Sequence, residues 1–140
     1  MATGLQRALP DHHQITSGQN GTPMKNFKKL EIWQLGMDIV DAVFDLYENL
    51  PYQKIAELKG QSIRAAISIP SNIAEGNSRR SEKDKLRFME IALGSSFELE
   101  TQSLSLQRRE WAPKEKVQEL LGVIDRHQMK LMAFMGKLEP

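Results

Sequence analysis

The chain has 140 residues, enough for one domain with a core and too few for two domains of ordinary size. Lys and Arg number 19 against 18 for Asp and Glu, so the net charge does not demand a polyanionic partner. The lack of cysteine excludes disulfides, thiolate catalysis and cysteine metal sites. No apolar run approaches the roughly 20 residues that span a bilayer, so we expect a cytoplasmic protein with no membrane attachment.

The first 23 residues are rich in Gly, Pro, Ser, Thr, Gln and Asn and show no hydrophobic periodicity. This composition is typical of disorder. We therefore interpret residues 1–23 as a disordered leader or an added extension, with Met24 as an alternative start, and residues 24–140 as the folded domain. His12 and His13 are adjacent and lack further ligands, so no metal site is predicted here.

The first expected helix runs from about residue 26 to residue 50, where Pro51 ends it. It carries two apolar stripes at helical spacing, with an acidic seam between them. One stripe consists of Leu30, Trp33, Met37, Val40, Phe44 and Tyr47. The other consists of Ile32, Leu35, Ile39, Val43, Leu46 and Leu50. One inward face suffices for a bundle helix, so the second stripe predicts an interface between subunits, made by Ile32, Leu35, Ile39, Val43 and Leu46.

The second expected helix, from about residue 53 to residue 75, organises the rest of the chain. Its apolar face repeats at helical spacing and includes small alanines that allow close packing. Pro70 removes one backbone donor and crowds the carbonyl of Ala66, so we predict a continuous helix that is kinked near Pro70. Gly76 is expected to supply the left-handed residue that closes the helix.

A polar line follows the second helix on another face. We predict that it meets carboxylates of the third helix in a structural polar network of Arg64, Asn72, Glu75, Glu90 and Glu98. Two other interpretations stay open at this stage. The line is also compatible with a solvated surface or with a ligand site, because paired charges near a core usually fix geometry but do not always do so.

The third expected helix starts at the cap Ser81 and ends near residue 110, and the fourth follows Pro113. Gly94 lies inside the third helix, where it costs about 1 kcal/mol relative to alanine, so we expect a packing reason for it. Four long helices joined by short loops predict an all-α fold. The expected architecture is an antiparallel up-down-up-down four-helix bundle.

Basic residues gather at both ends of this expected bundle. A candidate nucleic-acid-binding cluster at the turn between the second and third helices consists of Arg79, Arg80, Lys83, Lys85 and Arg87. The turn between the third and fourth helices carries Arg108, Arg109, Lys114 and Lys116. Acidic neighbours dilute both groups, so any binding by the first cluster is expected to be weak and non-specific.

No catalytic constellation is recognisable. No histidine follows a glutamate by three residues, which excludes the usual di-iron pattern of helical bundles. His127 is the sole histidine of the expected domain, and a lone histidine on a helix is more often a surface or partly packed residue than a metal ligand. There is no phosphate-binding glycine loop after a strand and no nucleophile elbow around Gly94. We therefore predict a non-enzymatic protein without a cofactor.

The segment 68–76, Ser-Ile-Pro-Ser-Asn-Ile-Ala-Glu-Gly, preceded by Arg64-Ala-Ala, resembles the signature of a bacterial protein family. This is the family of small four-helix-bundle proteins encoded in intervening sequences of 23S ribosomal RNA genes. The resemblance extends to segments 30–34 and 87–101, so it covers residues 24–140. One related branch, the accessory variability protein of diversity-generating retroelements, looks like a pentameric bundle that binds a reverse transcriptase and nucleic acid.

Two functional hypotheses follow. The first is a self-assembling interaction or scaffold module, in which the two apolar stripes imply association and the resemblance alone implies a pentamer. The alternative is an accessory protein of a retroelement that binds RNA or DNA and a reverse transcriptase, as the resemblance to that branch implies.

Overall fold

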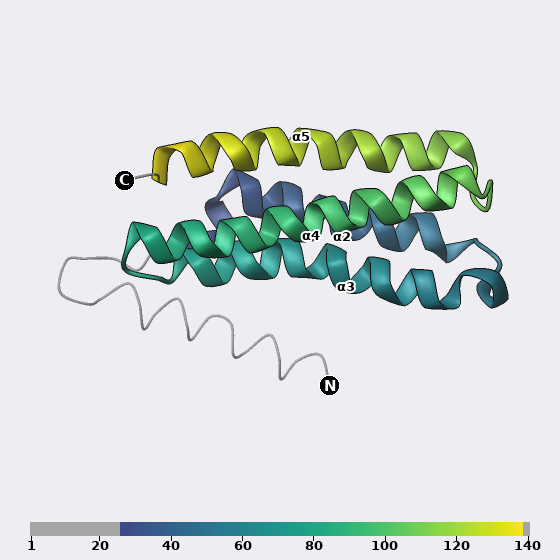
Figure 1. Ribbon diagram of the computed structural model, residues 1–140, viewed down its shortest axis with the longest axis horizontal. Helices are drawn as coiled ribbons and strands as arrows, with labels where there is room; N and C mark the ends of the chain where they lie inside the picture. The colour runs from purple at the N-terminus through teal and green to yellow at the C-terminus, as the bar shows by residue number, and fades with distance from the viewer. Residues whose placement is uncertain (1–25, 139–140) are drawn as a thin grey trace.

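The computed structural model describes residues 26–138, so the expected leader, residues 1–23, and the alternative start Met24 lie outside the described residues. The described part folds into four α-helices preceded by one 3-10 turn (Figure 1). These elements are η1 (Phe27–Lys29), α2 (Glu31–Glu48), α3 (Tyr52–Asn77), α4 (Glu82–Arg108) and α5 (Lys114–Leu138). None of the described helices combines the length and the apolar character needed to cross a membrane.

The helices alternate in direction, as predicted for an up-down-up-down bundle. The α2–α3 and α4–α5 connections lie at one end of the molecule, and the α3–α4 turn lies at the other (Figure 1). Each helix packs against the helices that precede and follow it, and α2 also packs against α5. The four helices therefore form a closed square in which α2 and α4 stand at opposite corners.

Local sequence signals explain several helix ends. Ser81 caps α4, because its Oγ accepts a hydrogen bond from the backbone N–H of Asp84 at 3.0 Å. Leu30 has an extended backbone and separates η1 from α2, so the expected first helix is divided in two. After α4, Glu110 has a φ of 57°, and the N–H of Trp111 donates to the carbonyl of Leu106 at 3.2 Å. This is a Schellman ending with glutamate where glycine is usual.

Helix α3 continues through Pro70, as predicted, and the bend expected there stays a prediction. Pro70 is buried against Gly36 of α2, where an added Cβ would lie 3.4 Å from the Cβ of Pro70. This is an ordinary van der Waals separation, so a methyl group at residue 36 would just fill the space between α2 and α3. Gly36 and Pro70 thus mark a close contact between these two helices.

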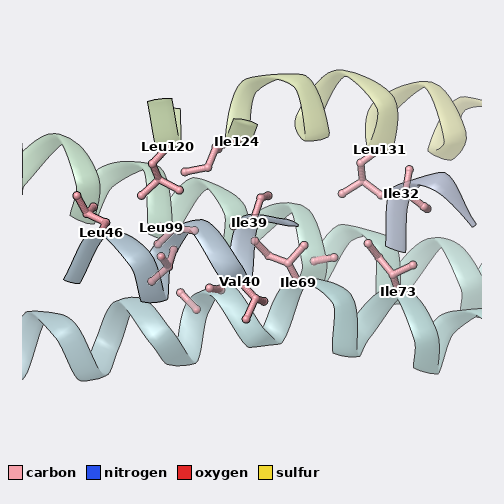
Figure 2. Close-up of a cluster of buried hydrophobic side chains, with 14 of the residues drawn as sticks. Ile32, Ile39, Val40, Leu46, Ile69, Ile73, Leu99, Leu120, Ile124 and Leu131 are labelled. Atoms are coloured by element: carbon pink, nitrogen blue, oxygen red, sulfur yellow. The ribbon is translucent and has the colours of Figure 1, made fainter. Parts of the chain in front are cut away.

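The core contains apolar side chains from all four helices (Figure 2). Its fully enclosed members include Ile39, Val43, Ile55, Ile69, Ile73, Met89, Leu99, Leu106, Leu120, Ile124 and Leu131. Figure 2 shows Ile32 and Leu131 toward one end of this cluster and Leu46 toward the other. The core therefore runs along the length of the bundle.

Two glycine predictions are wrong. Gly76 lies inside α3 with no left-handed backbone, and an added Cβ would lie 2.7 Å from the Cβ of Phe88. It therefore serves the close packing of α3 on α4. Gly94, for which a packing reason was expected, faces open space, because an added Cβ would meet nothing within 4 Å. The helix period alone cannot tell which glycine faces a neighbouring backbone.

Candidate functional site

Clusters of metal-ligating side chains and surface cavities are the features of the described residues that bear first on possible chemistry. No group of three or more His, Asp or Glu side chains is close enough there to hold a metal ion. A surface cavity of about 620 Å³ lies at the α4–α5 turn. Gln107, Glu110, Ala112, Lys114 and Gln118 line it. Glu110 and Lys114 supply the charged groups of this lining, and the exposed surfaces of the bundle offer further candidates for function.

The predicted basic cluster lies at the α3–α4 turn, and two of its arginines rest on one aromatic ring. The guanidinium carbon of Arg79 lies 4.7 Å from the ring centroid of Phe88, and that of Arg87 lies 4.6 Å away. Phe88 itself is only 7% exposed, so the ring on which both guanidinium groups stack is held by the surrounding core. Arg79 also pairs with Glu75 at 3.2 Å across an exposed turn.

The other members of the cluster differ in how they are held. Lys85 is half-buried, and its Nζ donates to the carbonyl of Asn77 at 3.1 Å. Arg80 and Lys83 are exposed. The structure therefore brings all five predicted cations to one end of the bundle, where Arg79 and Arg87 are fixed by stacking and Arg80 and Lys83 extend into solvent.

The predicted polar network does not form as proposed. Arg64, Glu75, Glu90 and Glu98 are all exposed, and no hydrogen bond or ion pair joins Arg64 to these carboxylates within residues 26–138. Asn72 donates to the Oγ of Ser68 at 2.9 Å, on its own helix. The charged members lie on the outer sides of α3 and α4, which favours the interpretation as a solvated surface.

Smaller side chains make the polar contacts between helices instead. Ser68 and Ser95 share a hydrogen bond of 2.8 Å between α3 and α4. Gln128 of α5 donates to Ser96 Oγ at 2.9 Å and to Glu100 Oε1 at 3.0 Å on α4. The sequence offers little signal for these pairs, because serine and glutamine are also common on helix faces that are exposed to solvent.

A third contact joins α2 to α3 inside the core. Tyr47 and Ser62 share a buried hydrogen bond of 3.0 Å. Burial raises the pKa of the Tyr47 phenol, and the bond to Ser62 opposes this rise in part. The neutral phenol is therefore the form that the core holds at neutral pH.

The predicted subunit interface is wrong in its residues. Ile32, Ile39, Val43 and Leu46 are at most 6% exposed in the single chain, and Leu35 is half-buried. These side chains enter the core because α2 packs against both α3 and α5 and must present an inward face wide enough for two neighbours. Residues that the chain itself buries cannot also bind a second subunit.

The other stripe of α2 supplies the exposed apolar side chains. Met37 is 37% exposed and Phe44 is 46% exposed, whereas Val40 and Tyr47 of the same stripe are buried against α3. Gly36 opposite Pro70 and Tyr47 opposite Ser62 set the register of the two helices, and this register places Ile67 between Met37 and Phe44. Met37, Phe44 and Ile67 thus form one apolar surface, the α2–α3 face.

A second apolar surface lies across the molecule. The bonds from Gln128 to Ser96 and Glu100 set the register of α4 and α5, which brings Phe97 level with Met129. The exposed apolar side chains here are Phe97, Leu104, Met129 and Met132, and we call them the α4–α5 face. In the square of helices the α2–α3 pair is opposite the α4–α5 pair, so the two faces point in opposite directions.

His127 departs most from expectation. The sequence favours a surface or partly packed side chain, but His127 is fully buried, and its Nε2 lies 3.0 Å from the backbone carbonyl oxygen of Ile32. Desolvation lowers the pKa of this imidazole, and the bond to the carbonyl opposes the shift in part. The ring therefore belongs to the core and not to a metal site.

Comparisons with known proteins agree with this fold. The family model of the 23S rRNA-intervening sequence proteins matches residues 28–133. A solved structure of a protein with unknown function from the S23 ribosomal protein family of Bacteroides thetaiotaomicron aligns with a TM-score of 0.67 at 20% identity, covering 74% of this chain and 97% of that one. Curated protein sequences give no match. The chain belongs to the 23S rRNA-intervening sequence protein family.

Proposed function

We propose that the protein is a non-enzymatic, self-assembling interaction module whose copies meet through the α2–α3 face and the α4–α5 face. The observation that carries this proposal is the exposure of large apolar side chains on two opposite sides of the bundle. Burying a fully exposed side chain of this size is worth about 1.5–3 kcal/mol, and these side chains, which are 37–65% exposed, together favour association. The partner that this proposal names is a second copy of the same chain.

The arrangement of the two faces supports a ring. A two-fold dimer pairs one patch with itself, whereas contact between two different patches repeats from subunit to subunit and closes when the rotation allows it. Two unlike faces on opposite sides fit the second type. The number of subunits that we propose is five, which rests on the resemblance to the pentameric branch and not on the faces themselves.

We expect Phe44→Glu, on the α2–α3 face, and Phe97→Glu, on the α4–α5 face, each to dissociate the assembly. A buried charge without a partner costs more than the contact provides, so either change should be enough. Size exclusion coupled to light scattering would compare the mass with five times the 16.0 kDa of one chain.

The matched control is Ile91→Glu, because Ile91 is 42% exposed and lies on α4 away from both faces. This variant should assemble as the unchanged protein does. A monomer of the unchanged protein at micromolar concentration would contradict the assembly, and a stable dimer or tetramer would contradict only the number five.

A second candidate function, weak binding of RNA or DNA, is favoured by the two guanidinium groups on Phe88. Because stacking already restricts these two side chains, binding a phosphate costs them less conformational entropy. Arg80 and Lys83, in the same cluster, are exposed. Assembly would repeat this cluster around one rim and make weak contacts multivalent. A reverse transcriptase as partner stays a prediction from the retroelement branch.

Titration of duplex DNA, structured RNA and a DNA–RNA hybrid at low and moderate salt tests this second function. We expect Arg80→Gln to weaken binding and to lower the slope against log salt by about 1, because one phosphate contact is lost. Arg108→Gln, at the opposite end of the bundle, should leave both quantities unchanged. Absence of binding by the unchanged protein even at low salt would rule out the nucleic-acid function.

A further inference from the structure

The His127 ring joins two helices that are distant in sequence. Its Nε2 lies 3.0 Å from the carbonyl oxygen of Ile32, in the first turn of α2, 95 residues away. A carbonyl oxygen can only accept, so the neutral ring donates through Nε2–H, and Nδ1 is the unprotonated nitrogen. Nδ1 is buried and has no hydrogen-bond partner among the described residues. The bond therefore uses the neutral ring in one tautomer.

A second proton would have to enter at this Nδ1. The new N–H would lack an acceptor, and the positive charge would lie among buried side chains such as Leu131, Ile124 and Ile32. An unpaired charge in such surroundings is costly, and a protein usually avoids it by staying neutral or by opening. The lowered pKa of His127 agrees with this reasoning.

Ionised groups on the surrounding helices do not compensate for that charge. Those nearest along each helix are Glu31 and Asp38 on α2, Arg64 and Glu75 on α3, Glu98 and Glu100 on α4, and Asp125, Arg126 and Lys130 on α5 itself. None of them belongs to the buried residues of the described chain. Glu31 pairs with Lys130, and Glu100 accepts from Gln128, so neither carboxylate is bonded to the imidazole.

Near His127, an exposed ion pair also joins α2 to α5. The ion pair between Glu31 and Lys130 spans 3.7 Å, and both side chains are at least half exposed. Such surface pairs contribute little to stability. A surface cavity of about 240 Å³ opens beside the seam, with Ile32 and Phe134 in its lining. Ile32, whose carbonyl faces the His127 ring, therefore borders a surface cavity.

We propose that His127 is a pH-sensitive latch, whose neutral ring fastens the first turns of α2 to α5 and whose protonation releases this seam. The proposal does not depend on assembly or on nucleic-acid binding.

The direction of the pH effect follows from proton binding. The closed form takes up the proton less readily than the open form, whose imidazole has an ordinary pKa near 6.5. The latch therefore holds fully above this pH. Below it, each pH unit raises the opening constant by up to tenfold, until the closed form itself becomes protonated.

Hydrogen exchange on the full chain, corrected for intrinsic exchange rates, tests the latch. We expect the protection of the amides of residues 35–40 to fall by up to tenfold between about pH 6.5 and pH 5.5, while amides in the middle of α3 and α4 keep theirs. His127→Gln retains a side-chain N–H for the Ile32 carbonyl but cannot be protonated in this range. Its protection should show no such step.

The double variant His12→Gln with His13→Gln is the control, since it removes the other two histidines and should preserve the step. A step of equal size in His127→Gln would overturn the proposal, as would an equal loss of protection in all four helices. Should His127→Gln fail to fold, NMR titration of the imidazole in the unchanged protein decides. A ring that titrates near 6.5 while the α2 amides keep their protection would also overturn it.

Discussion

Replacing Ile39 by alanine is expected to lower the free energy of unfolding by about 2–5 kcal/mol, through lost burial and the cavity left behind. Ile39 has no exposed surface and lies in the apolar cluster drawn in Figure 2. The cluster receives side chains from all four helices, so the surroundings of residue 39 cannot collapse without moving several of them. Urea unfolding followed by circular dichroism, at one fixed protein concentration, measures the change.

Phe44→Ala provides the matched comparison on the same helix. Phe44 is 46% exposed, so this change removes only part of a buried side chain and should lower the stability of the single chain by about 1 kcal/mol. Measurement at several protein concentrations separates this effect from assembly, because only assembly makes stability depend on concentration. A loss for Ile39→Ala as small as that for Phe44→Ala would contradict the assignment of Ile39 to the core.

The bundle itself could be predicted because its signals are local and repeated. Apolar residues return at helical spacing in each of the four segments, and Pro51, Ser81 and Pro113 mark the connections. The observed helices end within a few residues of the expected positions, and the largest difference is the break at Leu30. Short connections favour antiparallel packing of helices that are consecutive in the chain.

The roles of the two α2 stripes could not be predicted, for a geometric reason. Helical spacing shows which residues share a face, but not in which directions the neighbouring helices lie. The inward face of α2 reaches from Leu46 and Ile32 through Ile39 to Val40 and Tyr47, and so takes residues from both stripes. Only Met37 and Phe44 at its outer edge remain exposed. Counting stripes therefore predicted spare apolar surface but assigned it to the wrong residues.

Contacts between residues that are far apart in the sequence could not be predicted either. His127 lies on the inward stripe of α5 with Ile124 and Leu131, and its hydrogen-bond partner is a backbone carbonyl 95 residues away, which no local pattern encodes. The predicted network on Arg64 and Glu75 failed for the converse reason, since long charged side chains reach water readily from a partly covered helix face. Small residues such as Ser68 and Ser95 fit between helices without this cost.

Gly76→Ala is expected to destabilise the protein by about 1–3 kcal/mol, although alanine favours a helix more than glycine does. The added Cβ would lie 2.7 Å from the Cβ of Phe88 and 3.0 Å from the Cε of Met89. Met89 can move the end of its flexible side chain, but the Cβ of Phe88 is attached to the backbone of α4. Helices α3 and α4 must therefore separate, or Phe88 must shift under the arginines stacked on it.

Gly94→Ala is the matched control, because Gly94 lies in a helix of the same bundle but an added Cβ meets nothing within 4 Å. Here only the backbone preference acts, so we expect the free energy of unfolding to rise by about 1 kcal/mol. Opposite signs for the two glycines, measured by urea unfolding under identical conditions, would separate close helix packing from helix propensity. A gain in stability for both variants would show that α3 and α4 tolerate a methyl group at residue 76, and would contradict the close approach as the reason for Gly76.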